Sequence, residues 1–307
     1  MYHACRFNRS KILSCKILFE LSEINENFGE KCYFYFLTTK HQPEMKIIDL
    51  DDRNKSLYFV CLEDWSDEMK ESGNHKECWY NQMQNKGLRV KLAEDDNGVV
   101  GGMIQYLPIE YSNATGMDLY FINCIWVHGY THGRGNFRKK GMGKALIKAA
   151  EEDAKTLGAK GIAAWGLSIP VFMRASFFRH MGFIKTDKQG MMIMLWKKFT
   201  EDAEPPKWVK RKKFRIEPGK DKVTVTSFIN GGCPGMNLVH ERAKRAAQEF
   251  PGKVVFNTIS TFDKKAIEEW GLMDALFIDN KSINMGPPPS YQKIRKKIAR
   301  KVRKLKV

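Results

Sequence analysis

The sequence predicts a mixed α/β (α+β) protein with two successive folded regions. Its 307 residues exceed the size of one ordinary core, since single domains usually contain about 100–150 residues. Apolar segments with strand or helix periodicity alternate twice along the chain, and Pro205-Pro206 opens a basic stretch between the two series. Hydrophobic residues make up 43% of the chain, which excludes a largely disordered protein.

The first region is expected at residues 45–200. A strand begins at Met45, and Asn54 or Ser56 can cap the helix that follows it. A second helix is expected at 75–86, because Gly87 provides its end. The turn Asp95-Asp96-Asn97-Gly98 predicts a hairpin, since Asn and Gly both tolerate a positive φ. The remaining elements of this region are expected, in chain order, at 88–93, 99–107, 118–127, 145–157 (helix), 161–166, 170–181 (helix) and 191–198.

The second region is expected at 220–307, after a basic, Pro-containing linker at 201–219. Its elements are expected at 223–228, 238–250 (helix), 253–258, 264–270 (helix) and 275–279. From Tyr291 onward, apolar residues recur at helical spacing among Lys and Arg, which predicts a basic amphipathic helix packed on this region; they are Ile294, Ile298, Val302 and Leu305. Residues 1–44 show no sustained period. We expect an N-terminal extension there, and Met45 is a candidate for the native start.

The net charge of +17 is distributed unevenly. Lys and Arg crowd residues 293–306, which contain no acid, and a second basic group follows the two prolines at 207–215. The charge therefore marks a linker and a terminus more than an active site. In the tail these charges are either solvated or bind an RNA or another acidic surface.

The sequence favours a cytoplasmic protein. It has no apolar span of 18 residues that would predict a transmembrane helix. The apolar stretch at 12–19 is interrupted by Lys16 and lacks a cleavage site, so we expect no signal peptide. The seven cysteines are scattered without a Cys-x-x-Cys pair, so we expect neither a disulfide framework nor a zinc site, and no metal cofactor.

The most informative motif follows the long apolar strand at 118–127. The segment Arg138-Lys-Lys-Gly-Met-Gly-Lys144 opens a helix with two glycines two residues apart. Such glycines let the backbone approach a ligand, while the first N–H groups and the helix dipole attract an anion such as a pyrophosphate. The alternative is a tight strand-to-helix turn without a ligand. The order of residues differs from a P-loop, because no Gly-Lys-Ser/Thr is present, and from a Rossmann fingerprint.

This motif resembles that of the GNAT acyltransferase superfamily, Arg/Gln-x-x-Gly-x-Gly/Ala, at Arg138, Gly141 and Gly143. The order of elements at 45–200 and the segment Phe177-Phe178-Arg-His-Met-Gly182-Phe183 resemble this family as well. The resemblance implies a mostly antiparallel, twisted sheet flanked by helices, and an N-acetyltransferase in which an amine attacks acetyl-CoA directly. It implies that the backbone at Ile125 to Val127 pairs with the pantetheine arm. It also implies pyrophosphate binding by the N–H groups and side chains at Arg138, Lys139, Lys140, Gly141, Met142, Gly143 and Lys144.

Two positions depart from the family pattern. Phe178 stands where the family usually has a tyrosine that protonates the departing thiolate, and Val171 stands where an asparagine usually contacts pantetheine. These departures motivate an alternative function, a CoA-binding or peptide-binding regulatory protein that has lost catalysis. The basic tail motivates another, an RNA- or ribosome-associated adaptor.

Acetyl transfer to an amine requires the free base, so a lysine acceptor with a pKa near ~10.4 calls for a general base. The candidates are Glu110, Asp118, and His128 or His132 in the loop after the long strand; each could equally be a solvated surface residue. Tyr130 or Tyr111 could act as the acid in place of the missing tyrosine. Nothing in the sequence separates a small-molecule acceptor from a protein.

Two cysteines have distinct expectations. Cys124 is expected to pack in the core, because alternation along its strand places it on the face of Ile122 and Trp126. Cys233 follows a strand and precedes a helix, the layout of a thioredoxin-like site where a helix N-terminus lowers the pKa of a thiol. The second region resembles the YoaP-like domain found after GNAT domains, including 274–281 and 286–291. Met236 replaces a resolving cysteine, so we expect a ligand- or peptide-binding module with either a reactive or an inert Cys233.

Overall fold

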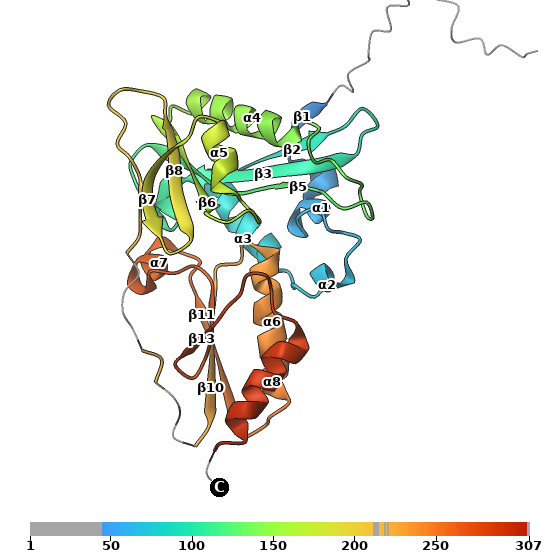
Figure 1. Cartoon of the computed structure of the whole chain (residues 1–307), viewed down its shortest axis with the longest axis vertical. Helices are drawn as coiled ribbons and strands as arrows, with labels where there is room; N and C mark the ends of the chain where they lie inside the picture. The colour runs from blue at the N-terminus through green and yellow to red at the C-terminus, as the bar shows by residue number, and fades with distance from the viewer. Residues whose placement is uncertain (1–44, 211–214, 218, 220, 306–307) are drawn as a thin grey trace, which may run out of the picture. The chain divides into compact units, whose positions relative to one another are not determined.

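The larger sheet has seven strands, of which one neighbouring pair is parallel. The structure is a computed structural model that describes residues 45–210, 215–217, 219 and 221–305 (Figure 1). The strands run in the order β1-β2-β3-β5-β6-β8-β7, and only β5 and β6 are parallel neighbours. Their bounds are β1 Lys46–Asp49, β2 Arg89–Glu94, β3 Val100–Pro108, β5 Leu119–Val127, β6 Gly161–Leu167, β7 Ile184–Gln189 and β8 Met192–Lys198. This arrangement confirms the mixed, mostly antiparallel sheet expected from the sequence.

Helices cover both faces of this sheet (Figure 1). On one face, α4 (Met142–Thr156) and α5 (Ala175–His180) bury their apolar sides, with Leu146 and Phe178 fully inaccessible. On the other face, α1 (Lys55–Phe59) and α3 (His75–Met83) pack a second core around Tyr58 and Trp79. The short helix η3 (Gln84–Lys86) extends α3 to Gly87, which has a left-handed conformation as the sequence predicts.

The strands β5 and β6 separate towards their carboxyl ends. Their paired residues run only from Leu119↔Gly161 to Ile122↔Ala164. At the same level the pairing of β3 with β5 is irregular, because Gln105 pairs with Cys124 while the adjacent Tyr106 pairs with Ile122. This bulge leaves Asn123 without a counterpart and bends β5 locally. An edge of β5 therefore opens beside the N-terminus of α4.

The smaller sheet has four strands in the order β11-β10-β12-β13, with β10 and β11 parallel and the other pairs antiparallel. Their bounds are β10 Val223–Ile229, β11 Val254–Ser260, β12 Ala275–Ile278 and β13 Lys281–Ile283. Helices α6 (Pro234–Gln248) and α8 (Tyr291–Val302) share a core with this sheet, in which Ile294 and Ile298 are fully buried. The expected basic amphipathic helix is thus confirmed. Helix α7 (Lys264–Trp270) packs with a separate cluster around Phe228.

The two sheets belong to one compact unit that begins before β1 and extends through the end of the chain. Helix α2 (Asp67–Lys70) contributes Glu68, which forms an ion pair with Arg242 of α6. The indole of Trp79 packs on the backbone at Gly232, where an added Cβ would lie 3.0 Å from it. The ammonium of Lys264 donates to the carbonyl oxygens of Ser112 and Ala114, at 2.9 and 2.6 Å.

Several boundaries differ from the sequence prediction. The helix expected at 170–181 begins only at Ala175, and the first helix after β1 is a single short α1, preceded by the 3-10 helix η2 (Asp52–Asn54) that Asp51 caps. Helices α4 and α6 each begin earlier than expected, at Met142 and Pro234. Elements without a counterpart among those expected from the sequence include β7, β13, the 3-10 helix η4 (Ile109–Tyr111) and the paired strands β4 (Ala114–Thr115) and β9 (Lys207–Trp208).

The expected linker at 201–219 is in part packed structure. Strand β9 pairs with β4, and Trp208 is only 5% exposed because it packs against Phe121. The expected extension at 1–44 lies outside the described residues. Met45 as the native start stays a prediction. Among the helices of the described part, none is long and apolar enough to span a membrane.

Candidate functional site

The N-terminus of α4 is open to a ligand. Gly141 precedes the helix with φ = 90°, and no side chain caps the first turn. A Cβ added at Gly141 would meet nothing within 4 Å. Because the first N–H groups of an α-helix have no partner within the helix, those of residues 142–144 face a free space. The side chains of Arg138, Lys139, Lys140 and Lys144 are exposed, so the segment before α4 and its first turn carry four positive charges.

Close packing holds this turn against β5. A Cβ at Gly143 would lie 3.3 Å from the ring of Phe177 and 3.8 Å from Val127, so the glycine lets helix and strand approach. The side chain of Arg138 lies across Gly129, where a Cβ would be 2.7 Å from Cδ of the arginine. The structure therefore brings Val127 and the loop 138–144 together, as the sequence predicts.

The open edge of β5 continues from this turn. Backbone groups alternate between the two edges of a strand, so the N–H groups of Ile125 and Val127 both face β6. The N–H of Ile125 donates to Sδ of Met173 at 3.4 Å, and Nε1 of Trp165 donates to the carbonyl oxygen of Asn123 at 2.8 Å. Side chains thus occupy the backbone groups nearest the end of the β5–β6 pairing. The next ones, at Val127, lie beyond it towards α4.

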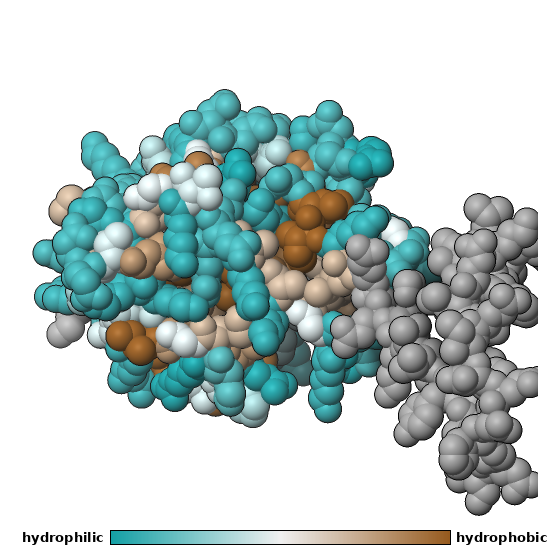
Figure 2. Space-filling view, turned by 90° about the horizontal axis from the view of Figure 1, so that it is seen from above, coloured by the Kyte–Doolittle hydropathy of each residue, from teal (hydrophilic) through white to brown (hydrophobic). Residues whose placement is uncertain are grey.

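Apolar side chains border this edge. Val171 and Phe172 are 53% and 38% exposed in the segment between β6 and α5. The ring of Phe172 lies 5.9 Å from that of Trp126 on β5 and 6.0 Å from that of Trp165 on β6. The surface in Figure 2 is mostly hydrophilic, with small hydrophobic patches between charged residues. The edge of β5 thus combines backbone hydrogen-bonding groups with apolar side chains.

Comparisons with known proteins agree with this geometry. Residues 86–185 match the model of a family described as an acetyltransferase (GNAT) domain. This stretch of the chain is similar to a GNAT acetyltransferase domain. It comprises β2 to the start of β7 and includes the open edge of β5 and the N-terminus of α4. The chain therefore carries an acyltransferase domain.

Solved structures similar to the chain include three acetyltransferases. A PaiA N-acetyltransferase from Thermoplasma acidophilum in complex with coenzyme A is 18% identical, with 51% of this chain and 99% of that chain covered and a TM-score of 0.38. A GNAT family acetyltransferase from Brucella melitensis in complex with acetyl-CoA is 17% identical, with 53% and 92% covered and a TM-score of 0.35. The GNAT family N-acetyltransferase YhbS from Escherichia coli in complex with CoA is 10% identical, with 54% and 90% covered and a TM-score of 0.39. The search of curated proteins gives no match.

Of the predicted bases, His128 is not free to act. Its side chain is fully buried, and Nε1 of Trp65 donates to its Nε2 at 2.9 Å. The indole N–H can only donate, so Nε2 accepts and the Nδ1–H donates to the carbonyl oxygen of Gly135 at 2.7 Å. With both nitrogens engaged, His128 fixes the loop that leads to the GNAT motif. This geometry gives His128 a structural role, and its role as a catalytic base stays a prediction.

Two exposed rings of the same loop stay near β5. Tyr130 is 43% exposed and stacks on His132, with ring centroids 5.3 Å apart. Both rings also contact Trp65, and Tyr130 lies 6.4 Å from Trp126. The guanidinium of Arg134 binds Asp64 at 3.0 Å and anchors the middle of the loop. Tyr130 thus remains a candidate acid, and His132 remains a candidate base.

Glu110 and Asp118 lie at the wrong end of β5. Asp118 immediately precedes the strand, whereas the GNAT motif follows its carboxyl end; eight residue steps of ~3.3 Å separate Leu119 from Val127, about 26 Å. Asp118 has φ = 56° and pairs with Lys160 at 3.3 Å, so it shapes a turn. Glu110 is exposed in η4 at the same end. Tyr111, beside it, interacts with Lys86 and is likewise far from the motif.

Phe178 is fully buried between Phe177 and Phe183, so this position supplies packing and no acid.

A polar cluster behind the bulge of β5 was not predicted from the sequence. The hydroxyl of Tyr58 donates to Oε1 of Gln105 at 2.8 Å. The ammonium of Lys76, 2% exposed, donates to the carbonyl oxygen of Tyr58 at 2.8 Å and to Sγ of Cys61 at 3.2 Å.

The thiols of Cys61 and Cys124 in this cluster have pKa values shifted in opposite directions. A hydrogen bond from Cys124 and the nearby charge of Lys76 lower the pKa of Cys61, against the effect of burial. The hydrogen bond to Cys61 and burial raise the pKa of Cys124 well above its usual range. Cys124 packs against the core together with Trp126, as the sequence predicts, although a polar partner accompanies the packing. The expected shared face with Ile122 is wrong, because the bulge at Asn123 reverses the alternation and Ile122 packs in the core on the opposite face. No motif signals this cluster, because its members come from α1, the turn after it, α3, β3 and β5.

Glu63, two residues after Cys61, has a strongly shifted pKa. Burial, and then the charges of Cys61 and Glu68, raise the pKa of Glu63 to about 7. A base with a pKa near the working pH accepts and releases protons efficiently. The sequence offers no hint of this residue, since its environment arises from the turn between α1 and α2.

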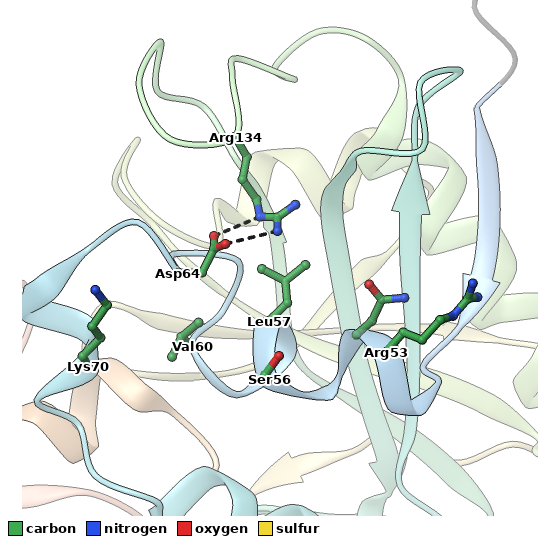
Figure 3. Close-up of a pocket in the computed structure, with 8 residues that line it drawn as sticks. Arg53, Ser56, Leu57, Val60, Asp64, Lys70 and Arg134 are labelled. Atoms are coloured by element: carbon green, nitrogen blue, oxygen red, sulfur yellow. Dashed lines mark hydrogen bonds and ion pairs between the residues drawn. The ribbon is translucent and has the colours of Figure 1, made fainter.

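A separate pocket of about 320 Å³ lies beside α1 (Figure 3). Arg134 reaches into it from the loop and binds Asp64, while Leu57 and Val60 form its apolar wall. None of the residues predicted as site residues from the sequence lines this pocket.

Cys233 directly precedes α6, as expected, but its pKa shifts the other way. Burial, and then the acidic neighbours Cys61 and Asp274, raise the pKa of Cys233 to about 12. The thiol keeps some exposed surface. The direction of the shift still holds, because both neighbours oppose a second negative charge. These effects oppose the expected activation by the helix N-terminus, and a reactive Cys233 stays a prediction.

Proposed function

We propose that the protein is an acetyl-CoA-dependent N-acetyltransferase whose acceptor amine attacks the thioester directly. The observation that carries the proposal is the N-terminus of α4, where free N–H groups and four exposed cations surround an open Gly141 within the matched GNAT domain. A pyrophosphate bears negative charge that such a site stabilises. Residues 138–144 would hold it, with Lys139 and Lys140 near the turn.

The pantetheine arm would lie along the open edge of β5, with Ile125 and Val127 as its backbone partners. The exposed side chains of Val171 and Phe172 offer apolar contacts to the arm beside this edge, whereas the polar contact that an asparagine usually makes is missing at Val171. The acetyl group would then approach the bulge at Asn123, where β5 and β6 separate. Met173 must release the N–H of Ile125 for the arm to pair there.

Glu63 is the base that we propose for the acceptor amine. It adjoins Cys61, which is hydrogen-bonded to Cys124 of β5. A carboxylate with a pKa of about 7 is half ionised at neutral pH and can remove a proton from an ammonium group. Tyr130 is the acid that we propose for the departing thiolate, although CoA, with a thiol pKa near ~8.5, leaves readily without one.

The acceptor is an amine of a small molecule or a protein, and a turnover assay identifies the class. Release of CoA is measured by chromatography for a panel of polyamines, amino-acid derivatives and peptides with free termini or lysines. We expect turnover with at least one class. Tight acetyl-CoA binding without CoA release across the whole panel would contradict the proposed function.

The substitution Glu63→Gln tests the proposed base independently of acetyl-CoA binding. We expect kcat to fall about a hundredfold at pH 7, the low end of the usual contribution of a general base, with little change in acetyl-CoA affinity. In the unsubstituted enzyme the rate should rise with pH through about 7, because Glu63 must be ionised, and Glu63→Gln should lose this inflection. Glu110→Gln, at the far end of β5, is the matched control with unchanged kcat.

We also propose that residues 220–307 form a thioredoxin-like, YoaP-like accessory module in a cytoplasmic protein. The order β11-β10-β12-β13, with one parallel and two antiparallel pairs and α6 and α8 on a shared core, supports the thioredoxin-like assignment. The module would bind a ligand or peptide without redox chemistry. Any contact of α8 with RNA or another acidic surface should weaken steeply between ~50 and ~200 mM salt, and salt-independent binding would contradict a phosphate contact.

A further inference from the structure

We propose that His75, His240 and Glu241 form a binding site for a divalent transition-metal ion, best matched by Zn²⁺, that joins α3 to α6. His75 is the first residue of α3, and the other two are neighbours in the middle of α6. Their candidate ligand atoms all lie within 4.8 Å of one another. The ion would take no part in acetyl transfer.

The carboxylate and one imidazole already face each other. Nε2 of His75 lies 2.7 Å from Oε1 of Glu241, and the rings of His75 and His240 meet edge to face with centroids 5.3 Å apart. Zinc binds nitrogen and oxygen ligands at about 2.0–2.2 Å, which places tetrahedral ligand atoms about 3.3 Å apart. Small side-chain rotations would bring the three atoms from the present spacing to that geometry.

A second hydrogen bond orients the buried ligand. Nδ1 of His240 lies 2.9 Å from Oγ of Ser227 on β10, which leaves Nε2 as the nitrogen free to bind a metal. Metal-binding histidines usually have such a partner on the other nitrogen, which fixes the ring and its tautomer. His240 is 4% exposed, and its ring also packs edge to face on Phe256. Burial, and then His75, lower the pKa of His240 to about 4, so its imidazole is in the neutral form that metals bind.

The environment suits three protein ligands and a water. The side chains of His75 and Glu241 are 30% and 23% exposed, so solvent reaches one side of the cluster. Two imidazoles and a carboxylate form a donor set typical of Zn²⁺, with the fourth position left to water. The ion would add to the ion pairs Arg242–Glu68 and Arg245–Glu71, which already join α6 to the segment around α2.

The simpler interpretation is an ordinary His75–Glu241 hydrogen bond beside a packed His240. It accounts for one contact, but not for the orientation of a neutral, buried imidazole towards the same point. The two interpretations make different predictions for metal binding.

Calorimetry with Zn²⁺ on the full chain, stripped of metal with a chelator, tests the proposal. We expect one ion per chain, and Co²⁺ in its place should give the visible absorption of a four-coordinate ion. His75→Gln, Glu241→Gln and His240→Ala should each weaken Zn²⁺ binding at least tenfold. His180→Gln is the matched control, because His180 is an exposed histidine on α5 whose Nδ1 bonds its own helix.

Two further measurements keep the outcome clear. Thermal unfolding without metal shows whether a variant still folds. His75→Gln and Glu241→Gln change partly exposed side chains and should still fold even if His240→Ala does not. Cys78→Ser tests the exposed thiol one turn after His75, and it should leave Zn²⁺ affinity unchanged. Absence of stoichiometric binding, or binding lost in Cys78→Ser but kept in His75→Gln and Glu241→Gln, would overturn the proposal.

Discussion

Helices α4 and α6 begin alike but face different surroundings. Each has 15 residues, follows a strand and a Gly-rich turn, and lacks a side-chain cap at its N-terminus. In front of α4 the space beside Gly141 is empty and lined by exposed cations. In front of α6 the backbone of Gly231 and Gly232 packs on Trp79.

The difference shows that a helix N-terminus stabilises an anion only where the anion has access to it and no other negative charge lies nearby. The dipole contributes roughly 0.3–1 kcal/mol to a nearby charge at the surface. At α4, four side-chain cations add to this effect. At α6 the first turn begins with Pro234, and Cys61 and Asp274 oppose the charge of the thiolate, so the pKa of Cys233 rises. The same local pattern therefore predicts an anion site in one place and an inert thiol in the other.

The largest effect is expected when the N-terminus of α4 is closed by a side chain. We expect Gly141→Glu to weaken acetyl-CoA binding at least about a hundredfold, or about 2.7 kcal/mol, because a carboxylate would fill the anion site. Isothermal calorimetry measures the affinity. Gly190→Glu is the matched control, since Gly190 also has a positive φ and nothing within 4 Å of an added Cβ. Equal affinities for the two variants would contradict the site.

The thiol before α6 offers a second test. We expect the alkylation rate of Cys233 to keep rising above pH 9, because a raised pKa leaves little thiolate at lower pH. At pH 7 it should react at least about tenfold more slowly than free cysteine, whose pKa is ~8.5. Peptide-resolved mass spectrometry after timed iodoacetamide treatment separates it from the other cysteines. An inflection below pH 8.5 would mean that α6 activates its thiol after all.

Cys61 provides the internal comparison in the same experiment. Cys124 and Lys76 lower the pKa of Cys61, so the alkylation rate of Cys61 should begin to rise at a lower pH than that of Cys233. Cys61→Ser should also lower the pKa of Cys233, because it removes a neighbouring negative charge.

The open, cationic turn before α4 could be predicted from the sequence, because its determinants are contiguous. Arg138, Gly141 and Gly143 lie within six residues, and both the open turn and the positive charge follow from local backbone and side-chain identity. The hairpin at Asn97-Gly98 was predictable for the same reason. The bulge in β5 was not, because it depends on the register between β3 and β5.

The acid–base residues were poorly predicted because their properties arise from distant contacts. His128 looked like a free base until Trp65, 63 residues earlier in the chain, was found to occupy its Nε2. Nothing in the sequence singles out Glu63, yet burial raises its pKa to about 7. The segment before Ala175 looked helical, but residues 168–174 instead form bends, in which Met173 has φ = 47° and bonds β5 and β6.

The smallest expected effect tests the charge around α4. Lys144→Ala removes one exposed cation from the first turn, which should weaken acetyl-CoA binding about threefold at low salt, since a single surface charge contributes below about 1 kcal/mol. The difference should shrink as salt is added, because an exposed charge is screened over about 10 Å at 0.1 M. Lys244→Ala, an exposed lysine on α6, is the matched control and should leave the affinity unchanged. If both variants weakened binding equally, the effect would come from the overall charge of the protein, and the contrast between the two helix N-termini would lose its electrostatic basis.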